Sequence, residues 1–125
     1  MIERLTRLKA TWPAPVWEWD PRFAAIASSF ETTLEPQVRA SAVLAFPRGW
    51  TAKSIDTAPP EFRELATRTG LRAGQRLLGG DPLACASLFG LWWPWGSGDK
   101  VTLRIGLLTG DVAPIRELFG VHDRA

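Results

Sequence analysis

The chain has 125 residues, 46% of them hydrophobic and 22% charged, which is the composition of an ordinary globular domain. Lys and Arg number 15 and Asp and Glu 13, so the formal net charge of +2 does not imply a polyanionic partner. Length and composition together exclude a disordered tail, a collagen-like fibre and a disulfide-stapled miniprotein. We therefore expect a single α+β domain over residues 1–125.

Cysteine content, hydropathy and amino-acid composition also bear on the cellular location and source of the protein. Cys85 is the only cysteine, so no disulfide forms within the chain. The N-terminal residues lack the long apolar run of a secretory signal, and no window approaches the ~18 apolar residues of a membrane span. We therefore expect a cytoplasmic protein without a membrane partner. The abundance of Ala, Arg, Gly and Pro favours a GC-rich bacterial genome.

Two helices are predicted in the first third of the chain. Over residues 2–10 an apolar residue recurs every three positions, as in a short amphipathic helix. Asp20-Pro21 starts the second helix, because Asp caps free N–H groups and Pro fits the first helical position. Pro36 ends it. The connector between the two helices is rich in Trp and Pro and leaves open whether residues 1–19 pack on the domain.

Alternating apolar residues predict a strand over residues 38–46. Every second residue of the segment VRASAVLAF points to one side if the chain is extended, and that side is apolar throughout. Residues 47–49 (Pro-Arg-Gly) form a turn, and residues 50–55 follow as a second, weaker strand.

The second half of the chain is predicted to contain an antiparallel meander. After a helix over residues 60–69 and a short strand over 75–78, two apolar runs, 86–95 and 101–108, flank a glycine-containing connection typical of a hairpin. A last helix covers residues 112–119. Consecutive strands favour antiparallel pairing, so we predict an α+β fold. Its antiparallel sheet has four or five strands with a C-terminal hairpin meander, and its helices pack mainly on one face.

The register of this hairpin decides which residues share a face. We predict the register that leaves one side apolar throughout, because a shift by one residue would mix the faces. On the reverse side Gly90 then lies opposite Gly106, and Trp92 lies opposite Arg104. A guanidinium stacked on an indole, beside the gap left by two glycines, predicts a contact site on this side of the sheet.

Residues that carry catalysis or bind metals are few. Cys85 and His122 are the only cysteine and histidine, and they formally offer a nucleophile and a base. We favour the structural interpretation, in which Cys85 is a small buried strand residue and His122 is a surface residue after the last helix. One residue of each kind is too few for a closed zinc site, and no glycine-rich segment matches a phosphate-binding loop. The sequence therefore predicts no catalytic residue, no metal and no cofactor.

Tryptophan and arginine carry the leading functional hypothesis. The chain has seven Trp, more than a core of this size needs, and Trp and Arg dominate interface hot spots. We predict a non-catalytic bacterial protein-interaction module of the immunity-protein, secretion-chaperone or adaptor type. It binds another protein or a second copy of itself. The predicted contact residues are Trp17, Trp19, Gly90, Trp92, Arg104 and Gly106.

Two other functions stay open. A sheet wrapped by helices can enclose a Trp-lined apolar pocket for a small aromatic or lipid-like molecule. In an enzyme of that kind, Asp56 or Asp99 would shuttle a proton. The third reading is contact with phosphate or nucleic acid, although such modules usually carry a larger excess of positive charge. It would use the densest positive stretch, formed by Arg63, Arg68, Arg72 and Arg76.

Overall fold

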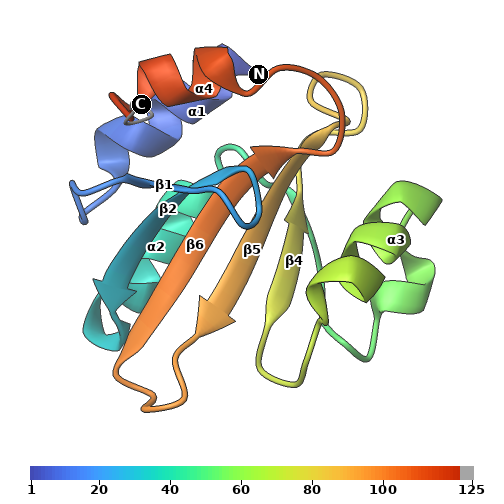
Figure 1. Ribbon diagram of the computed structural model, residues 1–125. Coiled ribbons are helices and arrows are strands. Elements are labelled where there is room, and N and C mark those ends of the chain that lie inside the picture. The colour runs from blue at the N-terminus through green and yellow to red at the C-terminus, as the bar shows by residue number, and fades with distance from the viewer. Residues whose placement is uncertain (122–125) are drawn as a thin grey trace.

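The structure is a computed structural model that describes residues 1–121. Its centre is a six-stranded antiparallel sheet in the order β1-β2-β6-β5-β4-β3 (Figure 1). The α+β class and the antiparallel sheet are confirmed, with six strands instead of four or five. The strands are β1 (Glu18–Asp20), β2 (Ala25–Glu31), β3 (Arg48–Trp50), β4 (Arg76–Gly79), β5 (Leu88–Pro94) and β6 (Lys100–Leu107). The helices are α1 (Ile2–Thr11), α2 (Glu35–Ala42), α3 (Pro60–Thr69) and α4 (Ala113–Leu118).

Helices cover the two faces of the sheet unequally. The face that packs on α1, α2 and α4 is called the helical face here, and it carries the larger core cluster. The opposite face, called the second face, packs on α3 over the β3-β4-β5 side of the sheet. There Phe62 and Leu65 of α3 meet Leu77, Phe89 and Leu91 of the strands. Three of the four helices thus share one face, as the sequence predicts.

The N-terminal helix belongs to the core. Leu5 and Leu8 are fully buried against the helical face. Just beyond the helix, Trp12 packs edge-to-face on Phe30 with ring centroids 5.7 Å apart, and its Nε1 donates to Ser28 Oγ at 2.9 Å. The N-terminal segment therefore packs on the sheet through both apolar burial and a buried hydrogen bond.

The predicted helix that starts at Asp20 is wrong. The chain there forms the end of β1, a tight turn and then β2, in which Ile26 and Phe30 are buried on the same side. A spacing of four residues fits one helical turn and also two full periods of a strand, so the apolar spacing does not discriminate between them. Asp20 does cap a backbone N–H group, that of Arg22, but within a turn.

The predicted strand over residues 38–46 is wrong as well. The segment contains the second half of α2, from which Val38, Ser41 and Ala42 point into the core. Alanine is the best helix former, and Pro36 is tolerated in the first turn of the helix. Helix propensity thus prevails over an alternation in which two of the five residues on the apolar side are alanines.

The remaining elements lie close to their predicted positions. Helices α1, α3 and α4 and strands β4, β5 and β6 all fall within two residues of the predicted ranges. Gly70 ends α3 in the left-handed conformation, with φ of 77°, which a residue without a Cβ adopts freely. The weak strand expected at 50–55 is displaced: β3 includes Arg48 and Gly49, which were expected in a turn.

The hairpin of β5 and β6 pairs one residue away from the predicted register. Trp92 lies opposite Leu103 and Arg104 opposite Leu91, so Trp92 and Arg104 do not form the predicted cross-strand pair. Opposed residues share a face, and a shift by one residue moves the side chains of one strand to the other face. Residues 88–92 are all buried, so alternation within this strand carries no signal that could fix the register.

The gap predicted between Gly90 and Gly106 does not exist. Gly106 lies opposite Phe89 and Gly90 opposite Ile105, which puts the two glycines on opposite faces of the sheet. A Cβ at Gly106 would lie 2.6 Å from the Phe89 ring, and one at Gly90 would lie 3.2 Å from Leu103. Side chains of the same molecule fill both positions, so neither glycine offers a docking surface.

Candidate functional site

One half of the second face is open. On the β1-β2-β6 side, no helix of residues 1–121 covers it, and the turn after β1 curls across the front of β6 toward α3 (Figure 1). Two hollows open on either side of this turn, and Pro21 lines both of them. We call the region the open face: the turn 21–24, the lining of the two hollows, Trp93, and the β1, β2 and β6 side chains on this side of the sheet.

Arg104 of β6 anchors the turn. Its Nε donates to Asp20 Oδ2 at 2.7 Å, and the two side chains are only 15% and 19% exposed. The guanidinium carbon lies 5.2 Å from the ring centroid of Phe23 and 5.1 Å from that of Trp93. These two rings meet edge-to-face at 5.1 Å. A charged hydrogen bond combined with aromatic stacking fixes the guanidinium in one position.

The backbone of the turn is constrained too. Asp20 Oδ1 accepts a hydrogen bond from the Arg22 N–H at 3.0 Å. Ala24 has a φ of 49°, and it is the one non-glycine residue of the described chain in the left-handed region. This conformation is uncommon for a residue with a Cβ and persists where the surroundings hold it. The turn therefore presents Phe23 over the sheet in a fixed position.

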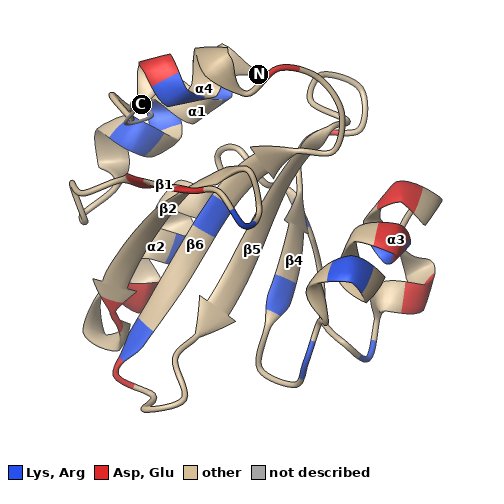
Figure 2. Ribbon diagram, in the orientation of Figure 1, with Lys and Arg blue, Asp and Glu red and all other residues tan. Residues whose placement is uncertain are grey.

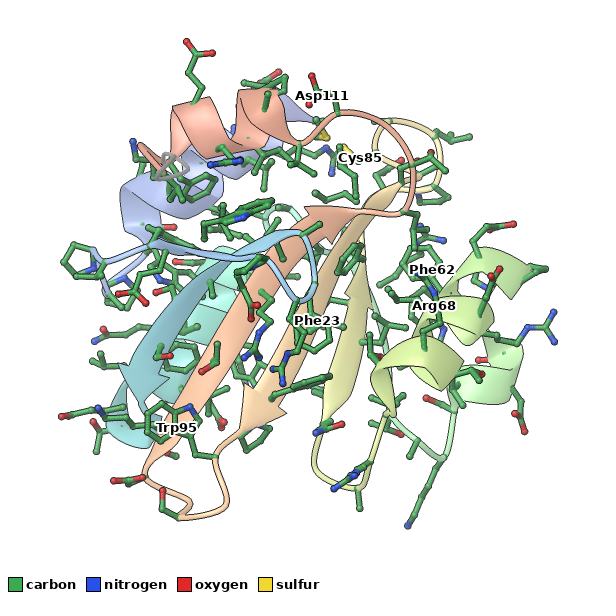
Figure 3. All side chains as sticks on the ribbon, in the orientation of Figure 1. Phe23, Phe62, Arg68, Cys85, Trp95 and Asp111 are labelled. Carbon is green, nitrogen blue, oxygen red and sulfur yellow. The ribbon has the colours of Figure 1, made fainter. Side chains whose placement is uncertain are left out.

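The larger hollow lies between this turn and α3 and has a volume of about 600 Å³. Phe23, Leu65 and Phe89 supply its apolar lining, and Arg22 and Arg68 supply its charge. Figure 3 shows Phe23 and Arg68 on facing sides of this region. Within residues 1–121 no acidic side chain lines the hollow, and the acidic residues of α3 gather on its outer side (Figure 2). The rim is therefore positive.

The smaller hollow, about 370 Å³ in volume, lies between β1 and the connection from β5 to β6. Trp95 lies here across the sheet (Figure 3), where its Nε1 donates to Thr102 Oγ1 at 2.8 Å. The Thr102 hydroxyl also shares a 2.7 Å hydrogen bond with Ser29. Trp95 keeps 45% of its surface exposed. Two hydroxyls thus hold an exposed indole at the end of the open face.

The predicted contact residues do not gather on one surface. Trp92 is 3% exposed and belongs to the core of the helical face. Trp17 is half-buried against aromatic rings of that same face. Trp19 and Arg104 both line the smaller hollow, although the Trp19 ring packs under Arg116 with the guanidinium carbon 4.1 Å from its centroid. Arg104 is therefore the predicted residue that lies at the centre of the open face.

Sequence reasoning missed the aromatic residues of the open face. Phe23 was placed inside a helix, and Trp93 was assigned to the wholly apolar side of the hairpin. Trp95 did carry a signal, because it directly precedes the glycine-rich connection 96–98, where a large indole has little to bury it. A bulky aromatic residue at a turn indicates either a cover over the neighbouring sheet or a contact surface.

The acid and thiol candidates that the structure describes lie on separate elements of the fold. Asp56 is exposed on a short 3-10 helix and lines neither hollow of the open face. Cys85 is buried. A hydrogen bond from the Ser97 hydroxyl lowers the pKa of Asp99, whereas the predicted proton shuttle needs a raised pKa. His122 lies outside the described residues. Within residues 1–121, no three His, Cys, Asp or Glu side chains stand close enough together to hold a metal ion.

The arginine series does not form one surface either. Arg63, Arg68 and Arg72 are exposed on α3 and the turn after it, whereas Arg76 is half-buried at the start of β4. Arg76 pairs across the strands with Trp92 on the helical face, so it is separated from Arg68 by the sheet.

No protein-family model, curated protein or solved structure matches the chain. In residues 1–121 no helix has both the length and the apolar character needed to cross a membrane.

Proposed function

We propose that the chain is a non-catalytic protein-interaction module that docks a partner protein on the open face. The larger hollow carries this proposal, because there the anchored turn fixes Phe23 beside an apolar floor and two exposed arginines form the rim. Aromatic and Arg side chains dominate interface hot spots, and side chains that are already fixed lose little entropy on binding. An immunity protein, a secretion chaperone or an adaptor would each use such a surface.

The lining favours a partner segment that is acidic and carries an apolar anchor. Among the described residues neither Arg22 nor Arg68 takes part in an ion pair. A carboxylate of the partner between them would complete both guanidinium groups with charge-assisted hydrogen bonds. A leucine or phenylalanine of the partner would enter the hollow against Leu65 and Phe89. Full burial of such a side chain contributes roughly 1.5–3 kcal/mol.

A photo-crosslinking amino acid at position 69, which lines the hollow and leaves both arginines in place, tests the proposal in cells of the source organism. The matched control is position 63, which lies on the same helix but does not line the hollow. We expect one discrete crosslinked product from position 69 and none from position 63. The product should disappear when Arg22→Glu reverses the charge across the hollow. A product of about twice the chain's mass would identify a second copy as the partner.

Equal crosslinking from both positions would show that α3 is merely exposed. A product that survives Arg22→Glu would show that the charge of the rim has no part in binding. Either result contradicts the proposed site.

A further inference from the structure

A third hollow lies on the helical face, between the end of α2 and strands β4 and β5. Its volume of about 300 Å³ is at the lower end of the range for small-molecule sites. Phe46, Leu78 and Trp92 form its apolar floor, and all three are buried. Arg39 of α2 and Arg76 of β4 line it from two different elements.

The two arginines lie on the same face of the sheet as Trp92 and line the same hollow. Arg76 is the cross-strand partner of Trp92, so both side chains lie on the helical face. From α2, the Arg39 guanidinium carbon lies 5.4 Å from the Trp92 ring centroid. Two like charges that line one small hollow repel each other, and an anion between them would relieve that repulsion.

Within residues 1–121, one ion pair includes either of these two arginines. Glu35 Oε2 lies 3.5 Å from Arg39 Nε, one helical turn away, and the two side chains are 32% and 48% exposed. Within residues 1–121 no ion pair includes Arg76. Arg48 also lines the hollow, but its guanidinium stacks on aromatic rings of the second face. The hollow is therefore positive, and Arg76 is its least neutralised charge.

We propose that this hollow binds a small organic anion with an apolar body. Arg39 and Arg76 hold its carboxylate or phosphate group, because the planar guanidinium fork matches both groups with two parallel hydrogen bonds. The apolar body lies against Phe46 and the exposed Val43. This site is separate from the open face, since the sheet lies between the two, and it does not depend on the protein partner proposed above.

Titration with 1-naphthoate tests the site, with the neutral 1-naphthamide as the matched probe that lacks the charge. The methyl groups of Val43 and Leu78 report binding by NMR, because both residues line the hollow. We expect saturable shifts at these methyls with naphthoate and at least tenfold weaker binding of naphthamide. A parallel titration with 1-naphthyl phosphate identifies the preferred acid group, according to which of the two anions binds more tightly.

Variants test the role of the two arginines. Arg76→Gln and Arg39→Gln should each weaken naphthoate binding at least tenfold, whereas Arg72→Gln, an exposed arginine outside the hollow, should leave it unchanged. Glu35→Gln should strengthen binding severalfold, because it removes the carboxylate that competes for Arg39. That gain cannot arise from a loss of folding, so it separates a binding role from a structural one.

Three results would overturn the proposal. The first is binding of naphthamide as tight as that of naphthoate. The second is an equal loss in Arg72→Gln and Arg76→Gln. The third is an absence of saturable shifts at Val43 and Leu78 with either anion at millimolar concentration.

Discussion

The two faces of the sheet are built by alternate residues of the same strands, and β6 shows the difference most clearly. On the helical face its side chains Val101, Leu103 and Ile105 are at most 2% exposed and are sealed in the larger core cluster. On the second face its side chains Thr102 and Arg104 are instead satisfied by hydrogen bonds to neighbouring strands and to the turn. A period of two residues allows one strand to serve both environments.

This difference implies a division of roles between the faces. Complete burial of a large aliphatic side chain contributes roughly 1.5–3 kcal/mol, whereas a hydrogen bond contributes a net ~0.5–1.5 kcal/mol. The helical face therefore supplies most of the stability. The open face contributes less to the free energy of unfolding, so its residues can be substituted in binding experiments without unfolding the protein. Substitutions on the two faces can separate the two roles.

The largest effect is expected from Leu103→Ala. Leu103 is fully buried on the helical face, so we expect its truncation to lower the free energy of unfolding by about 2–5 kcal/mol. The neighbouring Thr102→Val keeps the branched shape of the side chain and removes only its hydrogen bonds on the open face, so it should cost about 1 kcal/mol. Urea unfolding followed by far-UV circular dichroism measures both. Equal losses would mean that the two faces contribute alike.

Gly106→Ala tests the close packing of the second face beneath the turn, where the Phe89 ring and the Ala24 carbonyl lie against Gly106. The new methyl group would lie 2.6 Å from the Phe89 ring, so we expect a loss of about 1–3 kcal/mol in the free energy of unfolding. In a Phe89→Leu background, which lacks the ring, Gly106→Ala should cost less free energy of unfolding than it does in the parent. If the costs of the two substitutions simply add, the ring is not what the methyl group meets.

Asp20→Asn tests the anchor of the open face with a smaller expected effect. The substitution keeps an oxygen that can accept from Arg104 but removes the charge of a half-buried pair, so we expect a loss of about 1 kcal/mol. The loss should shrink at ~1 M salt, which screens the charges of the parent. Glu18→Gln is the control, because among the described residues Glu18 takes part in no ion pair. Equal effects of the two substitutions would remove the basis for the anchor.

Sequence patterns predict those elements whose ends are marked locally. Gly70 marks the end of α3, and the glycine-rich connection 96–98 marks the hairpin of β5 and β6. Residues 25–42 lack such markers, and their apolar residues recur at even spacings that a helix and a strand share. There the tertiary contacts decide, and local patterns cannot report them.

The candidate site was harder to predict than the fold, for a related reason. Arg104 was identified as a contact residue, but its partners Asp20 and Phe23 come from the distant turn that was predicted to be helical. A site formed by residues 84 positions apart depends on the strand order, and an error in one strand removes it. The register error had the same effect on Trp92, which moved from the predicted surface into the core.

The smallest expected effect concerns a charge that links the helical layer to the sheet. Hydrogen bonds from the backbone N–H groups of Ala84 and Leu83, together with the Arg4 charge of α1, lower the pKa of Asp81. A lowered pKa in the folded state stabilises the fold above the unfolded-state pKa of about 3.9, and this contribution is lost as the pH falls through the folded-state pKa.

Asp81→Asn should therefore flatten the dependence of the free energy of unfolding on pH below about pH 4, relative to the parent. Urea unfolding over a pH series measures this slope, and Asp56→Asn, at an exposed aspartate, is the control. Parallel curves for the parent and Asp81→Asn would show that the carboxylate does not hold the loop after β4. A pH-dependent loss of free energy in the parent as large as the loss in Leu103→Ala would show that charge, and not burial alone, ties α1 to the sheet. Charge would then contribute to stability on the helical face as well as on the open face.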